Sequence, residues 1–146
     1  PWTYQRRSAM KQDAVRAEFV EFIPRNLDPG VFYISRRFRT GSHLCCCGCG
    51  TKIVTPFRPT EYTLTETGKS ITIRPSIGNW NFPCRSHYLI TGSRVVWVGA
   101  MSQGEIDFGR KRDEQDKDRY FRRQREPTLY RRIRLWVREI LFRIKR

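Results

Sequence analysis

Most of the cysteines in this chain lie in one short stretch, and this clustering is typical of a metal site. Four of the five cysteines fall within Cys45–Cys49, and the fifth, Cys84, follows later. Neighbouring cysteines rarely pair as disulfides, because a disulfide needs Cα atoms about 4.4–6.8 Å apart with facing Cβ vectors. Thiolates that converge on a zinc ion are the natural alternative, and histidine is the other common ligand. The sequence therefore predicts Zn²⁺ as the cofactor.

The chain offers more ligands than the four that a structural zinc site takes. The possible ligands are Cys45, Cys46, Cys47, Cys49, Cys84, His43 and His87. Spacing alone allows two sets. Cys46 and Cys49 form a C-x-x-C pair, or else Cys45, Cys47 and Cys49 point the same way at alternate positions. Cys84 completes either set, and a cluster of buried, reduced cysteines is the alternative without a metal.

A second group of residues could perform acid–base and nucleophilic chemistry. His87 and His43 are candidate acid–base groups where they are not ligands, and Ser86 or Ser76 is the candidate hydroxyl. Ser86 directly precedes His87, and adjacent residues of a strand point to opposite faces. A direct Ser86–His87 pair therefore requires the segment to turn. The alternative is that Ser76, Ser86 and Asn79 are loop residues that cap backbone groups.

These residues must be positioned by a chain segment with the pattern of β structure. β-branched and aromatic residues fill the runs 18–23, 31–35 and 52–55. Two hairpins are predicted, one pairing 61–65 with 70–74 and the other pairing 88–91 with 94–98. Residues 10–17 are compatible with a short helix. The predicted fold class is β-rich α+β, with a small zinc-stapled antiparallel β domain.

The character of the chain changes after Gly99. Residues 107–126 mix both charges with few apolar groups, and form either a solvated helix or a linker. Apolar residues then recur at three- and four-residue spacing, at Leu129, Ile133, Trp136, Ile140 and Ile144. This spacing predicts a basic C-terminal amphipathic helix. The helix packs on the β core, or it docks on a partner protein, an anionic membrane or a nucleic acid.

Three segments follow from this pattern: a lead-in at 1–17, a zinc-binding β-rich domain at 18–100 and a charged helical extension at 107–146. The chain has 146 residues, with 29 Lys and Arg against 14 Asp and Glu, for a net charge of +15. This balance favours acidic partners, and a nucleic acid is a possible partner on charge alone. We find neither a secretory signal nor a run of about 20 apolar residues that would span a bilayer. Together with clustered reduced cysteines, this predicts a cytoplasmic protein.

Several motifs together resemble a family of small bacterial zinc-binding proteins encoded with ubiquitin-like protein conjugation systems. The resemblance rests on the segments 19–24, 27–35, 43–50, 75–80 and 84–88. The usual family pattern resembles His-x-Cys-Pro-Cys-Gly-Cys-Gly, with proline at the position of Cys46. The resemblance therefore implies Cys45, Cys47, Cys49 and Cys84 as the metal ligands. It also implies a ubiquitin-like protein and its activating and conjugating enzymes as partners.

The leading hypothesis is a zinc-containing peptidase or deconjugase that processes a ubiquitin-like protein. Its candidate catalytic residues are His87, Ser86 and His43, with Ser76 as the other hydroxyl. A thiolate-rich site is a poor Lewis acid, which favours a structural role for the zinc. The alternative is a non-catalytic, zinc-stapled adaptor that binds the modifier or its conjugating enzymes. A nucleic-acid-binding module is the weaker alternative.

Overall fold

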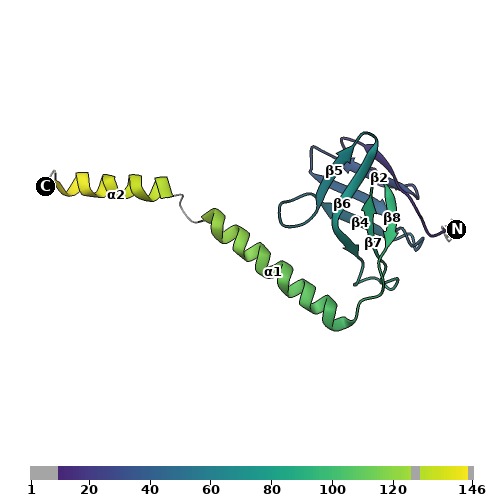
Figure 1. Ribbon diagram of the computed structural model, residues 1–146. Helices are drawn as coiled ribbons and strands as arrows, with labels where there is room; N and C mark the ends of the chain where they lie inside the picture. Colours follow the sequence, from purple (N-terminus) through teal and green to yellow (C-terminus); the bar gives the residue numbers. More distant parts are fainter. Residues whose placement is uncertain (1–9, 126–128, 145–146) are drawn as a thin grey trace, which may run out of the picture. The chain divides into compact units, whose positions relative to one another are not determined.

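The computed structural model describes residues 10–125 and 129–144 (Figure 1). The chain divides into two compact units, residues 1–106 and 107–146. The first unit contains two four-stranded sheets, and the second is helical. The protein is therefore a small β-rich α+β protein, as the sequence predicts.

The first sheet has the strand order β1-β2-β3-β4. Its strands are β1 (Arg16–Phe19), β2 (Val31–Ser35), β3 (Thr40–Leu44) and β4 (Lys52–Pro56). Two of its strand pairs are antiparallel, but β1 pairs with β2 in parallel. Residues 20–30 provide the crossover connection that a parallel pair requires. The sheet therefore departs at this edge from the purely antiparallel domain that the sequence predicts.

The second sheet has the order β5-β6-β7-β8 and is antiparallel throughout. Its strands are β5 (Thr63–Thr67), β6 (Ser70–Gly78), β7 (His87–Thr91) and β8 (Arg94–Trp97). The register between β6 and β7 shifts between Ile73 and Ile77. This irregularity matters below, because the part of β6 beyond it faces the start of β7.

A single buried cluster contains side chains from both sheets. Phe32 and Ile34 come from β2, Ile73 from β6, and Tyr88 and Ile90 from β7. The two sheets therefore pack against each other through this cluster. Because side chains alternate along a strand, the residues next to Tyr88 and Ile90 belong to the outer face of the second sheet.

The predicted helix at residues 10–17 is wrong for the described residues. Ala14 forms an isolated bridge with Arg94, and Val15 donates its N–H to the carbonyl of Ser93 at 2.8 Å. The side chain of Val15 is buried in the core. Tertiary pairing with the β7–β8 turn therefore holds this segment extended against its weak helical pattern.

The charged segment after Gly99 is a helix and not a linker. α1 spans Gln103–Arg125 and α2 spans Leu129–Ile144. At the start of α1 the Ser102 N–H donates to the Glu105 carboxylate at 2.8 Å and the Glu105 N–H donates to the Ser102 hydroxyl at 3.3 Å, which is a capping box. Ion pairs between residues three apart, such as Arg110 with Asp107, stabilise its exposed surface. No helix in the described part of the chain is long and apolar enough to cross a membrane.

Candidate functional site

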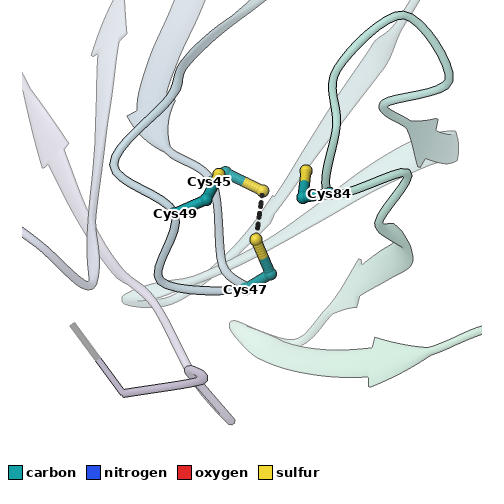
Figure 2. Close-up of side chains that lie close together, drawn as sticks. All are labelled: Cys45, Cys47, Cys49 and Cys84. Carbon is teal, nitrogen blue, oxygen red and sulfur yellow. Dashed lines mark hydrogen bonds between the residues drawn. The ribbon is translucent and has the colours of Figure 1, made fainter. Parts of the chain in front are cut away.

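Four cysteines converge at one end of the β domain. Cys45, Cys47 and Cys49 follow β3 in a single loop, and Cys84 lies in the loop between β6 and β7 (Figure 2). Their four sulfur atoms all lie within 4.8 Å of one another. The sulfur atoms of Cys45 and Cys47 are 3.3 Å apart. These are the four cysteines that the family resemblance implies as ligands.

The donor set fits a structural zinc ion. A tetrahedral site with Zn–S bonds of about 2.3 Å separates its sulfur atoms by about 3.8 Å, which is close to the spacing here. Gly48 and Gly50 have φ angles of 85° and 75°, a conformation that allows the loop to turn back on itself. Burial raises the pKa of Cys49, but hydrogen bonds with Thr51, Cys47 and Cys84 together outweigh it and lower the pKa to about 7. Cys49 therefore loses its proton to solvent readily, and the resulting thiolate is the form that binds a metal.

Cys46 lies apart from these four sulfurs. It is completely buried and belongs to the hydrophobic core cluster. Burial raises the pKa of its thiol to about 12, which keeps it protonated. Cys46 therefore anchors the β3–β4 loop to the core as a small apolar side chain.

A buried polar network connects the cysteines to the loop between β6 and β7. The Ser86 hydroxyl lies 3.0 Å from the Cys45 sulfur. The Asn79 side-chain amide donates to the Ser86 hydroxyl at 2.8 Å and to the Cys45 sulfur at 3.4 Å. The backbone N–H of Asn79 also donates to the carbonyl of Ser86 at 2.9 Å. Asn79 and Ser86 thus pin both ends of this loop to the cysteine cluster.

The same loop separates a serine and a histidine that contact each other. Nε2 of His87 lies 2.8 Å from the hydroxyl of Ser76, and the histidine is buried. The ring of Trp80 packs edge-on against the imidazole, with 4.8 Å between the ring centroids. A Cβ atom at Gly78 would lie only 2.4 Å from Nε1 of Trp80, so the indole can occupy this position only because residue 78 has no side chain. Nδ1 of His87 is buried without a hydrogen-bond partner among the described residues.

This serine–histidine pair lies on the outer face of the second sheet. His87 pairs with Gly78 across β6 and β7, and its neighbours Tyr88 and Ile90 face the core. Leu89 and Val96 are cross-strand partners on the same outer face. Val96 and Val98 are exposed, so apolar groups flank the pair. Ser76 is half-buried and His87 is buried, so the pair lies just beneath this outer face.

The remaining predicted catalytic histidine is a core residue. His43 is 1% exposed, stacks on Phe32 with 4.6 Å between the ring centroids, and contacts the Tyr88 hydroxyl through Nε2 at 2.8 Å. Burial lowers its pKa to about 3, so the imidazole is neutral. His43 therefore lies in the core and contacts neither Ser76 nor Ser86 by any hydrogen bond among the described residues.

Comparison with known families bears on this arrangement. The family model described as bacterial ubiquitination-like system serine protease (BubE) matches residues 19–98, which is more than half of the chain. The chain belongs to the BubE family. The match covers both cysteine motifs as well as Ser76 and His87. No curated protein and no solved structure gives a significant match.

The structure brings together most of the residues that the sequence singled out, although in two places and not in one. Ser86 lies beside the cysteines, while Ser76 contacts His87. Trp80 packs on His87, and Asn79 hydrogen-bonds Ser86 and Cys45. Sequence reasoning did not assign them these roles. Their sequence signal was their position in the segment 75–80, one of those that carry the family resemblance, because packing on a histidine leaves no pattern in the sequence.

Proposed function

We propose that this protein is a serine peptidase that processes a ubiquitin-like protein, with Ser76 as nucleophile and His87 as general base. The observation that carries the proposal is the 2.8 Å contact between Nε2 of His87 and the Ser76 hydroxyl. The BubE family description supports this reaction type. The nucleophile is thus placed at Ser76, the alternative hydroxyl, and not at Ser86, whose hydroxyl lies against Cys45.

The chemistry follows the general pattern of serine hydrolysis. Nε2 of His87 takes the hydroxyl proton as Oγ of Ser76 attacks the scissile carbonyl, and the imidazolium then protonates the leaving amine. A water molecule, activated by the same nitrogen, then hydrolyses the acyl-enzyme. In many serine peptidases a carboxylate holds the histidine ring in place. Here the Trp80 ring, packed against the imidazole, holds His87 in its orientation in place of a carboxylate.

The zinc ion has a structural role in this proposal. When bound, an ion held by four thiolates has no open position and stabilises the fold around it. Cys84 belongs to the loop whose two ends carry Ser76 and His87, so closing the cluster sets the distance between these residues. The proposed substrate is the precursor or a conjugate of a ubiquitin-like protein, and its activating and conjugating enzymes are further partners.

A covalent serine probe tests the assignment of the nucleophile. The zinc-loaded chain is treated with a fluorophosphonate, and the labelled residue is identified by mass spectrometry. We expect labelling at Ser76, its loss in Ser76→Ala, and a decrease of roughly 10³-fold or more in the labelling rate of His87→Ala. Ser86→Ala, saturated with zinc, is the matched control and should still be labelled at Ser76.

Cleavage of the ubiquitin-like precursor by the same variants connects the label to the function. Labelling at Ser86, or cleavage that survives Ser76→Ala, would overturn the proposed mechanism. A folded, zinc-loaded chain that binds the ubiquitin-like protein but neither labels nor cleaves would instead be an adaptor.

A further inference from the structure

The α2 helix exposes large apolar side chains that the proposed peptidase does not use. Ile133, Trp136, Val137 and Leu141 are 50%, 63%, 42% and 56% exposed. With about 100° of rotation per residue, Ile133, Trp136, Val137 and Ile140 form one stripe along the helix, with Leu141 at its edge. Among the side chains of α2 that the structure describes, Leu135 is the exposed apolar residue on the opposite side. α2 is thus an amphipathic helix with a broad apolar face.

The charged residues of α2 are mostly positive. Its sequence contains five arginines and one glutamate, in contrast to the mixed charges of α1. Arg132 and Arg134 lie on either side of the apolar stripe, about 100° from its centre. Arg138 lies on the opposite face, and these three side chains are exposed. Positive charge therefore borders the apolar stripe along both edges.

We propose that α2 is a membrane-surface helix that lies in the interface of an anionic bilayer. An apolar face with a tryptophan, bordered by basic residues, is the pattern of helices that lie in the plane of a membrane. The aliphatic stems of Arg132 and Arg134 cover the edges of the stripe while their guanidinium groups reach the phosphate layer. Trp136 sits at the level of the headgroups, which the indole ring prefers.

An anionic membrane fits these observations better than the other partners of a basic helix. Nucleic acid would use the arginines but would leave the apolar stripe in water. A coiled-coil partner would need a narrow seam at a and d positions, whereas this stripe covers a wider arc. An acidic lipid surface satisfies the apolar face and both arginine borders at the same time.

The test measures binding of the full, zinc-loaded chain to vesicles. Vesicles of phosphatidylcholine with 30% phosphatidylserine are compared with pure phosphatidylcholine in a co-sedimentation assay. We expect binding to the anionic vesicles that weakens as salt is raised, and little binding to the neutral ones. Helical circular dichroism should rise on binding, and the fluorescence of Trp136 should shift to shorter wavelength, a shift that Trp136→Phe removes.

Matched substitutions separate the apolar face from general charge. Ile133→Gln together with Trp136→Gln should abolish vesicle binding, while Leu135→Gln on the opposite side should change it less than about threefold. Arg132→Gln together with Arg134→Gln should weaken binding to anionic vesicles roughly 30-fold, at about 1 kcal/mol for each charge. Zinc content and fluorophosphonate labelling should not change in any of these variants.

Three outcomes would overturn the inference. The first is no preference for anionic vesicles, and the second is equal loss of binding in Leu135→Gln and the stripe variant. The third is a dimer in solution, or protection of α2 from hydrogen exchange without lipid, that the stripe variant removes. In that case a second copy or the chain's own β domain covers the stripe. None of these results bears on labelling of Ser76, so the proposed peptidase activity is tested independently.

Discussion

Ser76 and Ser86 are both candidate nucleophiles, and their hydrogen-bond partners distinguish them. Ser86 is next to His87 in the sequence, yet its hydroxyl contacts Cys45 and Asn79. Ser76 lies on another strand and still reaches Nε2 of His87. Register across β6 and β7, and not proximity in the sequence, decides which hydroxyl meets the imidazole.

Ser86→Ala is predicted to weaken zinc binding. Its hydroxyl lies 3.0 Å from the Cys45 sulfur, and hydrogen bonds to a ligand of this kind typically contribute 10–100-fold to metal affinity. Competition with a chromogenic chelator should therefore give roughly a tenfold weaker affinity. Ser76→Ala, the same substitution at the other serine, should keep the affinity of the natural chain. Equal affinities for all three proteins would contradict the role of Ser86.

His43 is predicted to make the fold less stable in acid. Its pKa is lowered to about 3 by burial, so between pH 6.5 and 3 the unfolded chain binds a proton that the folded chain does not. The free energy of unfolding should therefore decrease as the pH is lowered from 6.5 to 3, by up to about 1.4 kcal/mol per pH unit. Urea unfolding at several pH values measures this slope. His43→Phe has the same zinc ligands and lacks this group, so its slope should be shallower.

The elements differ in how far the sequence predicts them. The run 31–35 matches β2, and both hairpins of the second sheet are present. β3 was not predicted, because Thr40–Leu44 is rich in small and polar residues. Glycine at position 41 allows the Phe32 ring to pack against the β3 backbone, since a Cβ atom would lie 2.4 Å from that ring. Such close approaches between strands have no signature within a single segment.

In the candidate site, too, the sequence predicts local features but not contacts between distant segments. The clustered cysteines alone predict a metal site, and the glycines of their loop have the positive φ angles expected of a tight turn. The contact of His87 with Ser76 depends on the register shift between Ile73 and Ile77. The position of Trp80 on the imidazole depends on the shape of the whole loop. Both are tertiary properties that residue types and spacing do not contain.

The outer face of the second sheet is predicted to bind the protein substrate. Val96→Asp, on the same outer face as the serine–histidine pair, should raise KM for a protein substrate about 10-fold or more, because it places a charge in an apolar contact. Turnover of a small ester should stay the same. Val54→Asp is the control, since Val54 is exposed at an outward position of β4 in the other sheet. An equal rise in KM for both variants would contradict a specific substrate surface.

At the scale of the molecule, the loop between β6 and β7 connects the proposed zinc site with the proposed Ser76–His87 pair. Removing zinc with a chelator should lower the melting temperature and also the fluorophosphonate labelling of Ser76, and zinc under reducing conditions should restore both. Cys46→Ala should still bind one zinc ion per chain, as measured by elemental analysis, while Cys47→Ala should lose it. Full labelling of a metal-free chain would show that the pair forms without the cluster.

The order of the cysteines along the chain has a consequence for synthesis. Cys45, Cys47 and Cys49 leave the ribosome well before Cys84, so three thiolates are available while the second sheet is still being made. The fourth thiolate emerges after Ser76 and just before His87. The last proposed ligand and the last member of the proposed Ser76–His87 pair therefore become available to the nascent chain within three residues of each other. For the proposed peptidase, we therefore expect zinc supplied during synthesis to increase the fraction of chains in which Ser76 reacts with a fluorophosphonate.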